Sequence, residues 1–324
     1  MERMARIEAI GGPEVIQWVD VDLPPPGPGE VRMRNSAVGL NFIDTYHRSG
    51  LYPVPLPSGL GGEAAGVVEA VGEGVGDFSV GDRVATFGPG LGAYSTARNL
   101  PAKLLFALPD DISDETAAAT LLKGCTVEFL VERCARVEQG WTVLVHAAAG
   151  GVGQIAVRWL KAIGASVIAT VGSADKVALA EEAGADHVLV SRGEGIADFV
   201  REMTGGAGVE VVFDGVGKAT WEASLASVRR RGLVVSFGNA SGPVDGVALG
   251  ALAKAGSVYV TRPTMFDYYV TPEERAAGST RLFQMLRSGA VRANIGQRFA
   301  LEDAADAHRA LEAGKTTGST VLVP

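Results

Sequence analysis

The stretch TVLVHAAAGGVGQIAVRWLKAIG, residues 142–164, decides the fold of this chain. An apolar, β-branched run ends at Val145, a turn of small residues follows, and a helical pattern begins near Gly151. A strand, a tight turn and a helix in this order form the first half of a βαβ unit. The question is why the turn needs such small residues.

Three small residues of the turn, Ala147, Gly150 and Gly153, have the spacing A-x-x-G-x-x-G, a relative of the G-x-G-x-x-G dinucleotide fingerprint. The first permits the tight turn, another lets the backbone approach a pyrophosphate, and the last lets the helix pack closely on the sheet. The helix then directs its N–H groups and positive dipole end at the phosphates. Tight packing alone also explains such a turn, so its surroundings must decide.

Downstream of this turn, strands and helices alternate. The sequence has six apolar, β-branched runs separated by helical segments, at residues 142–147, 166–171, 187–190, 209–215, 233–238 and 257–263. This alternation predicts an α/β fold with a doubly wound, parallel, six-stranded Rossmann sheet and right-handed crossovers. Glycines at 164, 184, 205, 232 and 256 are expected where its helices end. In this context the turn predicts dinucleotide binding.

The end of the second strand indicates which dinucleotide binds. An NAD-binding chain carries Asp or Glu about 20 residues after the fingerprint, where it binds the ribose hydroxyls. Residues 170–173 hold no acid, and a missing carboxylate removes repulsion from a 2′-phosphate. Ser173 and Lys176 are therefore expected to bind that phosphate, which favours NADPH over NADH. The alternative is that Lys176 is only a solvated helix residue.

Residues 1–122 have a different sequence pattern, in which short β runs are broken by Gly and Pro. This pattern predicts a small β-barrel. The segment 113–122 is expected to begin a helix with Ser113 as its N-cap. Residues 123–263 form the predicted Rossmann domain. The tail, residues 264–324, contains two amphipathic helical stretches and a closing strand at 319–324, and is expected to return to the first domain.

The amino-acid composition limits the classes of function that fit this chain. The chain has 324 residues, 47% of them hydrophobic, and its net charge of −8 gives no general attraction to nucleic acid or to an anionic membrane. Two cysteines suggest a reducing, cytoplasmic location. The charged N-terminus has no signal-peptide pattern, and no apolar run is long enough to span a bilayer. A small-molecule substrate is the expected partner.

Five segments of the chain share a further pattern: NFIDTYHRSGLYP, LPSGLGGEAAGVVEAVGEGVGDFSVGDRV, HAAAGGVGQIAVRWLKAIGA, RRGLVVSFGNASG and YVTRPT. Together they resemble the zinc-free NADPH:quinone oxidoreductases, the zeta-crystallin-like branch of the medium-chain dehydrogenase/reductase superfamily. The resemblance runs nearly from end to end. It implies a GroES-like catalytic domain, a dinucleotide-binding domain inserted before a C-terminal return, a cleft between the domains, and a homodimer.

The resemblance also implies that the catalytic zinc is missing. The positions that hold Cys, His and Cys ligands in the alcohol dehydrogenases correspond to Asn41, Gly62 and Leu122, none of which binds zinc well. The segment YSTARNLPAKLL lacks the cysteines of the structural zinc lobe. Independently, the four histidines, at 47, 146, 187 and 308, show no metal-type spacing. We expect no metal.

Without a metal, another group must polarise the acceptor and stabilise the developing oxyanion. The resemblance places Asn41, Tyr46 and Tyr52 over the nicotinamide, where an amide or phenol can donate a hydrogen bond; packing is the alternative role for each tyrosine. Cys125 is expected to be a packing thiol.

The resemblance further implies a set of cofactor contacts. Lys123 and Thr126 are expected at the nicotinamide ribose, Phe237 to Ala240 along the nicotinamide half, and Arg262 near the same cleft or a dimer contact. The full set of expected contacts is Asn41, Lys123, Thr126, Ala149, Gly150, Gly151, Val152, Gly153, Gly172, Ser173, Lys176, Ser191, Arg192, Gly215, Val216, Phe237, Gly238, Asn239, Ala240 and Arg262.

One position departs from the family pattern. Bacterial relatives tend to place a tyrosine against the adenine where this chain has Ser191, followed by Arg192. Arg192 is expected to compensate by stacking or by meeting the phosphate.

Three functions fit these observations. The first is NADPH-dependent reduction of quinones, by one or two electrons. The second is reduction of the C=C bond of enals or enones, and no residue pattern separates it from the first. The third, from another class, is a structural or RNA-binding role of the kind that crystallin-like proteins acquire; the negative charge and the lack of a basic patch argue against it.

Overall fold

The structure is a computed structural model that describes residues 1–88 and 90–324. The chain forms two compact units. Unit 1 comprises Met1–Lys123, Thr271–Ser279 and Ala293–Pro324, and unit 2 comprises Gly124–Val270 and Thr280–Arg292.

The sheet of unit 2 is parallel and has six strands, as predicted. Their spatial order is β11-β10-β9-β12-β13-β14. The chain starts at β9 in the middle, builds outward to β11, and then returns to build β12 to β14 on the other side, which is the doubly wound order. The strands are β9 (Thr142–Val145), β10 (Ser166–Val171), β11 (His187–Val190), β12 (Val209–Asp214), β13 (Val228–Ser236) and β14 (Tyr259–Thr261).

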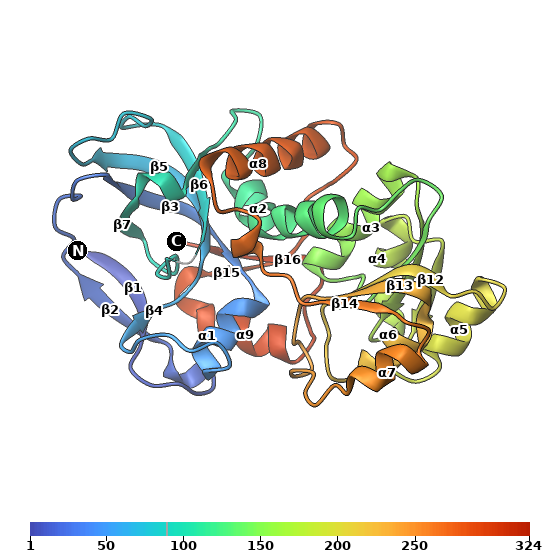
Figure 1. The fold of residues 1–324 in the computed structure, drawn as a ribbon. Coiled ribbons are helices and arrows are strands. Elements are labelled where there is room, and N and C mark those ends of the chain that lie inside the picture. The colour runs from blue at the N-terminus through green and yellow to red at the C-terminus, as the bar shows by residue number, and fades with distance from the viewer. Residues whose placement is uncertain (89) are drawn as a thin grey trace. The chain divides into compact units, whose positions relative to one another are not determined.

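Helices cover both faces of this sheet, as the ribbon shows (Figure 1). The first two connecting helices contact one another, and so do the next two. Apolar side chains from the central strands, such as Leu144, Ile168 and Val212, are buried beneath them. The helices are α3 (Gly151–Ile163), α4 (Val177–Glu182), α5 (Ile196–Met203), α6 (Trp221–Ser227) and α7 (Leu249–Lys254).

The helix-ending role of glycine was predicted correctly at four of five positions. Gly164, Gly184, Gly205 and Gly256 have φ of 91°, 104°, 57° and 109°, the left-handed conformation that glycine adopts at helix ends. The prediction for Gly232 was wrong. It lies inside β13, where a Cβ would be 2.6 Å from a methyl carbon of Val228 and 2.9 Å from the Glu210 carbonyl oxygen, so glycine is needed there for packing.

Helix α2 (Asp114–Glu128) begins after Ser113, as expected, and the Ser113 hydroxyl accepts the Thr116 N–H at 3.1 Å. After Glu128 the helix continues as a π-helical turn, Phe129–Cys134, which was not predicted from the sequence. Cys125 is buried and forms no disulfide with Cys134. Helix α8 (Pro272–Arg287) begins after Thr271, whose hydroxyl accepts the Glu274 N–H.

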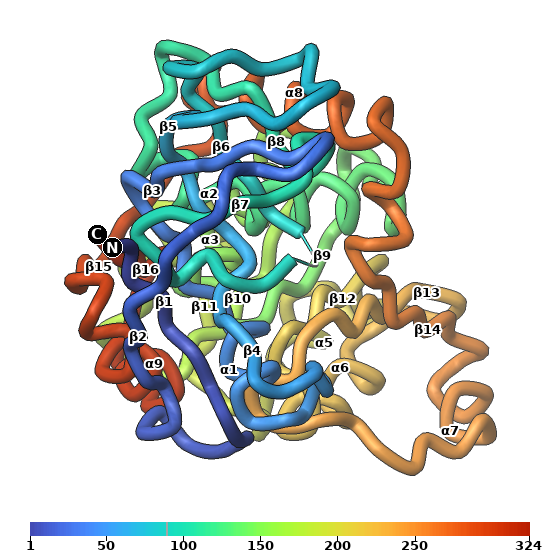
Figure 2. Tube along the Cα trace, turned by 90° about the vertical axis from the view of Figure 1, so that its left-hand side faces the viewer, coloured from blue at the N-terminus to red at the C-terminus, as the bar shows by residue number. Residues whose placement is uncertain are grey.

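Unit 1 is mainly antiparallel β-structure, and Figure 2 traces its long strands β3, β5 and β6 alongside one another. A three-stranded sheet has the order β2-β1-β4, and a seven-stranded sheet the order β15-β16-β3-β5-β6-β8 with β7 also paired to β3. The strands are β1 (Glu2–Ile7), β2 (Gln17–Val21), β3 (Glu30–Leu40), β4 (Ser58–Gly59), β5 (Glu63–Val71), β6 (Arg83–Phe87), β7 (Ala97–Pro101), β8 (Leu105–Ala107), β15 (Ile295–Ala300) and β16 (Ser319–Val323).

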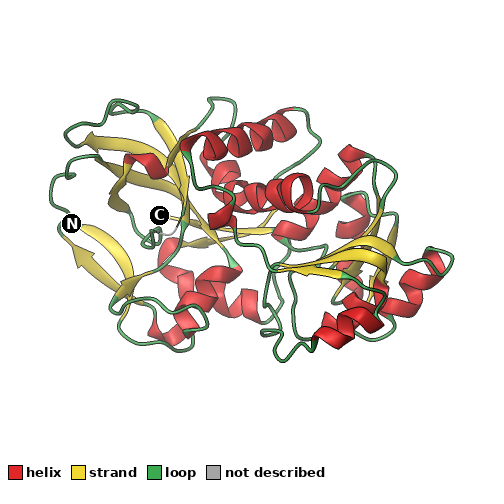
Figure 3. Cartoon of the chain, viewed as in Figure 1, coloured by secondary structure: helices red, strands yellow, loops and turns green. Residues whose placement is uncertain are grey.

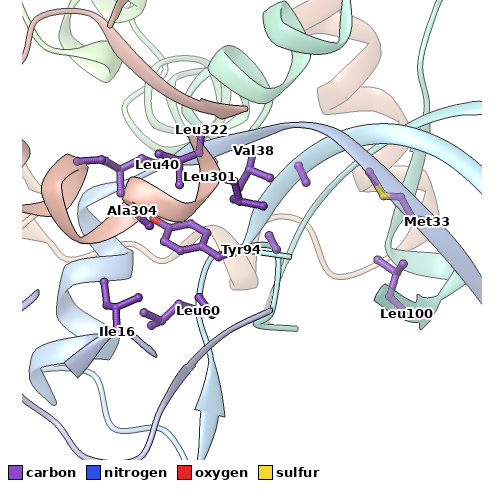
Figure 4. Packing of buried hydrophobic residues seen from close by; sticks show 14 of the residues in the cluster. Ile16, Met33, Val38, Leu40, Leu60, Tyr94, Leu100, Leu301, Ala304 and Leu322 are labelled. Carbon is purple, nitrogen blue, oxygen red and sulfur yellow. The ribbon is translucent and has the colours of Figure 1, made fainter. Parts of the chain in front are cut away.

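Two parts of the C-terminal tail, Thr271–Ser279 and Ala293–Pro324, belong to unit 1, whereas residues 264–270 and Thr280–Arg292 belong to unit 2. Strand β16 pairs antiparallel with β3, Val321 opposite Gly39. Helices α1 (Phe42–Ser49) and α9 (Ala304–Glu312) complete the unit (Figure 3). Figure 4 shows its core, in which Tyr94, Leu322 and Leu301 pack together although they come from distant parts of the chain. Short 3₁₀ turns lie at Pro13–Val15, Ala102–Leu104, Ala174–Lys176, Met265–Asp267 and Leu301–Asp303.

Within residues 1–88 and 90–324, none of the helices combines the length and the apolar character needed to cross a bilayer.

Candidate functional site

The turn between β9 and α3 lies where the strand order of unit 2 reverses. Connections from β9 and β12 leave in opposite directions, and the carboxyl ends of strands at such a point are where α/β proteins commonly bind ligands. Ala147 takes the left-handed conformation, with φ 52°, and Gly150 is the N-cap of α3 without a side-chain cap. The Ala148 N–H donates to the Thr170 carbonyl at 3.0 Å, which ties the turn to β10.

The two glycines of this turn have different surroundings. A Cβ on Gly153 would lie 2.3 Å from the Ala147 carbonyl oxygen and 2.6 Å from the Ala148 Cα, both backbone atoms. A Cβ on Gly150 would come no closer than 3.3 Å to any neighbour. Gly153 is therefore required for close packing of the helix, whereas Gly150 leaves space above the helix N-terminus. This arrangement fits a bound pyrophosphate.

After the second strand, two cations lie near Gly172. Lys176 ends the 3₁₀ turn that Ser173 caps, and the Arg192 Nε donates to the Gly172 carbonyl at 3.3 Å. The same turn contains an exposed acid, Asp175, that was not predicted to matter. Its pKa is lowered mainly by a hydrogen bond from the Ser173 hydroxyl. The turn after β10 thus carries Lys176 and one carboxylate, and Arg192 contacts its first residue, Gly172.

Ser191 organises its own turn after β11. Its hydroxyl donates to the Glu194 carbonyl at 2.6 Å and accepts the Gly193 N–H at 3.0 Å. The hydroxyl proton is thus used within the loop, and the exposed side chain next to it is that of Arg192.

The turns after β12 and β13 pack against one another. A Cβ on Gly238 would lie 2.2 Å from the Gly215 carbonyl oxygen, and one on Gly215 would lie 2.9 Å from the Phe237 ring. The Ala240 N–H donates to the Gly215 carbonyl at 3.4 Å, and Arg262 donates to the Gly238 carbonyl at 3.1 Å. The expected contacts from 215–216 and 237–240 are thus brought together, with Arg262 beside them.

Asp214 holds the first of these turns, and the sequence analysis missed it. The carboxylate is buried at the end of β12 and accepts the N–H groups of Val216 and Gly217, each at 2.9 Å, and the hydroxyls of Thr220 and Ser224 at 2.7–2.9 Å. An acid that closes an apolar strand in the segment VEVVFDG was the signal available for it.

His146 is buried beneath the first turn. Its Nδ1 is 2.9 Å from the Thr170 hydroxyl and its Nε2 is 3.1 Å from the Ser224 hydroxyl. Burial lowers the pKa of His146, so the ring is neutral. It lines a small apolar hollow with Val152, Gly153 and Phe237.

The three expected catalytic residues lie together in unit 1, around helix α1. Asn41 is the N-cap of α1 and Tyr46 lies within it. The Tyr46 and Tyr52 rings meet edge to face with centroids 5.2 Å apart, and the Tyr52 N–H donates to the Tyr46 carbonyl at 3.1 Å. Tyr46 is 8% exposed and Tyr52 is half-buried.

Asn41 is held by two buried carboxylates. Its backbone N–H donates to Asp44 Oδ2 at 2.9 Å, and its side-chain Nδ2 donates to Glu63 Oε2 at 2.8 Å. Burial raises the pKa of Asp44 to about 7 and also raises the pKa of Glu63, while Lys123 and the hydrogen bonds to the carboxylates oppose the effect. Lys123 is buried in α2 and Thr126 follows one turn later.

Asp44 is also linked to a buried histidine. Tyr94 donates its hydroxyl proton to Asp44 Oδ2 at 3.0 Å and lies 3.0 Å from His308 Nε2. Arg48, which has no acceptor, donates to His308 Nδ1 at 2.9 Å, so the proton of the neutral ring is on Nε2 and points to Tyr94. Burial and the charge of Arg48 lower the pKa of His308 to about 3.

Comparisons with known proteins agree with this arrangement. A family model described as an alcohol dehydrogenase GroES-like domain matches residues 27–110, and one described as a zinc-binding dehydrogenase matches residues 151–280. The chain is 53% identical to a quinone oxidoreductase of Pseudomonas aeruginosa, with 100% of both chains covered. The chain belongs to the quinone oxidoreductase family.

Two further relatives bear on the chemistry of this quinone oxidoreductase family member. The crystal structure of Escherichia coli quinone oxidoreductase complexed with NADPH matches it with a TM-score of 0.97 at 48% identity, covering 99% of this chain and 100% of that one. A 2-haloacrylate reductase of Burkholderia is 42% identical, with 100% of this chain and 99% of the relative covered.

The zinc of the matching family model does not fit this quinone oxidoreductase family member. Asn41 directs its amide nitrogen at Glu63, Gly62 has no side chain, and the Leu122 side chain has no ligand atom. In the part of the chain that the structure describes, no three His, Cys, Asp or Glu side chains are grouped as metal ligands would be. No step of the reaction is therefore assigned to zinc.

Proposed function

We propose that this chain is an NADPH-dependent quinone reductase that transfers hydride to a conjugated carbonyl acceptor without a metal. The observation that carries this function is the 53% identity, over the whole of both chains, to a quinone oxidoreductase. The cofactor supplies the hydride when it is bound. The residues of this chain bind it, orient it and stabilise charge on the acceptor.

In unit 2, the turn from Ala149 to Gly153 receives the pyrophosphate, because the uncapped N–H groups of α3 point to a space without a side chain. Lys176, Ser173 and Arg192 bind the 2′-phosphate, and Gly172 lets it approach the backbone. This assignment is supported by the Arg192 contact with the Gly172 carbonyl and by the lack of an acid at 170–173. The remaining turns, 215–216 and 237–240, line the nicotinamide half.

In unit 1, Asn41, Tyr46 and Tyr52 act on the acceptor. This is supported by the edge-to-face contact of the two phenols and by the fixed Asn41 amide, since aromatic and amide groups suit a conjugated ring. A hydroxyl that donates to the acceptor oxygen would stabilise the negative charge that hydride transfer develops there.

A second candidate function is reduction of a C=C bond conjugated to a carbonyl group. The 42% identity over 100% of this chain to a 2-haloacrylate reductase favours it specifically. Both reactions deliver hydride to an electron-poor conjugated acceptor, so the same site serves either.

Oxidation of NADPH, followed with a small quinone and a simple enone side by side and with NADH as the control, tests these functions. Fast turnover of the quinone with a preference for NADPH is expected. Turnover of the enone alone would assign the chain to the alkene reductases. Binding of NADPH without turnover of either acceptor would contradict both proposals.

We also propose that the chain works as a homodimer in the cytoplasm. Strand β14 is the outermost strand of the unit 2 sheet, and unpaired strand edges favour pairing with another chain. Exposed apolar side chains accompany it, with Tyr259 64%, Leu249 81% and Val270 66% exposed. A second copy that pairs with β14 would cover them.

A further inference from the structure

Glu63, like Asp44, is a fully buried acid of unit 1 that contacts the expected site residue Asn41. It begins β5, is 0% exposed, and its carboxylate lies against the backbone of β3. Gly39 makes room for it, since a Cβ there would lie 2.4 Å from Glu63 Oε2 and 2.2 Å from the Ala118 carbonyl oxygen. Glycine at position 39 of β3 therefore leaves the space that the buried Glu63 carboxylate occupies.

The carboxylate connects three parts of the unit. Oε2 accepts the side-chain amide of Asn41 at 2.8 Å, and Oε1 accepts the backbone N–H of Leu122 at 2.6 Å. Leu122 lies inside helix α2, where an N–H group ordinarily donates to the carbonyl four residues earlier. Glu63 therefore links Asn41, the N-cap of α1, to Leu122 in α2 through hydrogen bonds.

Lys123 supplies the opposite charge. Its Nζ is 3.5 Å from Glu63 Oε2, and the two side chains are 7% and 0% exposed. At this distance the pair is held by charge, and within residues 1–88 and 90–324 the Lys123 Nζ has no hydrogen-bond partner of normal geometry. An ammonium group has three N–H donors, so Lys123 retains donors for a ligand.

We propose that Glu63 is a positioning residue for hydride transfer, which it supports by fixing the Asn41 amide and the Lys123 ammonium through one buried carboxylate. This inference rests on the proposed function. Removing one partner of a buried charged network leaves the other unpaired, which is energetically costly. The Glu63 network is therefore expected to hold Asn41 and Lys123 in fixed positions. Asn41 cannot turn its amide over without setting its carbonyl oxygen against the carboxylate.

The same contacts explain how the site is organised without a metal. Asn41 and Leu122 occupy positions that correspond to zinc ligands in the alcohol dehydrogenases, and both donate to Glu63. The carboxylate links these two positions with hydrogen bonds, as a metal would link them with coordinate bonds. The charge that remains near the acceptor is then the ammonium of Lys123.

The test compares Glu63→Gln, Glu63→Asp and the control Glu128→Gln. Glu128 is a buried acid of α2 that pairs with Arg133 at 2.8 Å and lies in unit 2, so its replacement makes the same chemical change elsewhere. Steady-state kcat and KM are measured per folded enzyme, with the folded fraction taken from circular dichroism. The dissociation constant for NADPH is measured by nicotinamide fluorescence.

Glu63→Gln is expected to lower kcat about 10- to 100-fold, the range found when groups that orient ligands are removed. The dissociation constant for NADPH should change within about threefold, because most expected contacts lie in unit 2. Glu63→Asp keeps the charge and should recover at least about threefold of the lost kcat. Glu128→Gln should lower stability and leave kcat per folded enzyme unchanged.

Two results would overturn the inference: a Glu63→Gln enzyme with wild-type kcat, or an Asp variant no better than the Gln variant. If Glu63→Gln does not fold, Glu63→Asp decides alone. Its shorter side chain moves the carboxylate away from the donors of Asn41 and Leu122, so kcat should fall. A Glu63→Asp enzyme with wild-type kcat would then contradict the positioning role of Glu63. A wild-type protein that turns over neither quinone nor enone would instead contradict the proposed function.

Discussion

The different surroundings of Gly150 and Gly153 predict opposite effects of the same added methyl group. In Gly153→Ala the Cβ would overlap two backbone atoms, at 2.3 Å and 2.6 Å, whereas ordinary van der Waals contact begins at 3.4 Å. Helix α3 would have to move about 1 Å from β9, and such overpacking costs about 1–3 kcal/mol or more. At about 2–4 °C per kcal/mol, the melting temperature of unit 2 is expected to fall by about 2–12 °C.

Gly150→Ala places its methyl group 3.3 Å from the Ala147 carbonyl oxygen, and the φ of −78° suits alanine. The loss of the N-cap preference of glycine costs about 0.5–1 kcal/mol, so the protein stays folded. The methyl group enters the space assigned to the pyrophosphate, and the dissociation constant for NADPH is expected to rise about tenfold or more, equivalent to about 1.4 kcal/mol.

Differential scanning calorimetry and fluorescence titration with NADPH measure the two effects on the same preparations. Gly153 is thus expected to be needed for packing and Gly150 for ligand approach. A Gly153→Ala protein that melts with the wild type, or a Gly150→Ala protein that binds NADPH as tightly as the wild type does, would refute this distinction.

Four shorter predictions concern the cofactor, the metal, pH and assembly. Lys176→Ala is expected to raise the KM for NADPH about tenfold through loss of a charge-assisted hydrogen bond, with NADH nearly unchanged; equal effects would exclude recognition of the 2′-phosphate. Activity should survive exhaustive chelation, and a loss that zinc restores would contradict the metal-free site. Since burial raises the pKa of Asp44 to about 7, its protonated form stabilises the fold at low pH, and this contribution is lost as pH rises from about 4 to 7. Asp44→Asn should therefore cancel about 2 kcal/mol of the stability gained between pH 8 and 5, as urea unfolding would show. Tyr259→Lys, at the edge of the unit 2 sheet, is expected to shift the protein towards a monomer in light scattering while NADPH binding persists, and an intact dimer would exclude that edge.

The sequence was sufficient for the Rossmann sheet because its signals are local. The apolar runs around 142–145 and 166–171 could be assigned to parallel strands, and the glycine spacing after Val145 identified the first turn. The return of residues 319–323 to unit 1 was also predictable, since a closing apolar strand needs an open partner. Gly232 was misassigned because packing against Glu210, not a helix end, requires glycine there.

The polar centres of both units were not predictable, because they depend on partners far apart in the chain. Glu63 follows two glycines and precedes an apolar strand, so nothing local shows that residues 22 and 59 positions away donate to it. Asp214 has its donors within ten residues, and the acid at the end of an apolar strand in VEVVFDG is a local signal for it. The π-helical turn after α2 left no local signal that periodicity detects.

Asp214 and Glu63 show two ways to keep a buried carboxylate beside a ligand site. Asp214 is surrounded by neutral donors, two backbone N–H groups and two hydroxyls, so its role is complete within its own turn. Glu63 has an amide, one N–H group and an ammonium that is not fully hydrogen-bonded. A network that is satisfied except for one cation has its remaining capacity at that cation. Among the described groups around the Glu63 carboxylate, the Lys123 ammonium is the one left without a hydrogen bond, and a ligand oxygen is the group that would accept from it.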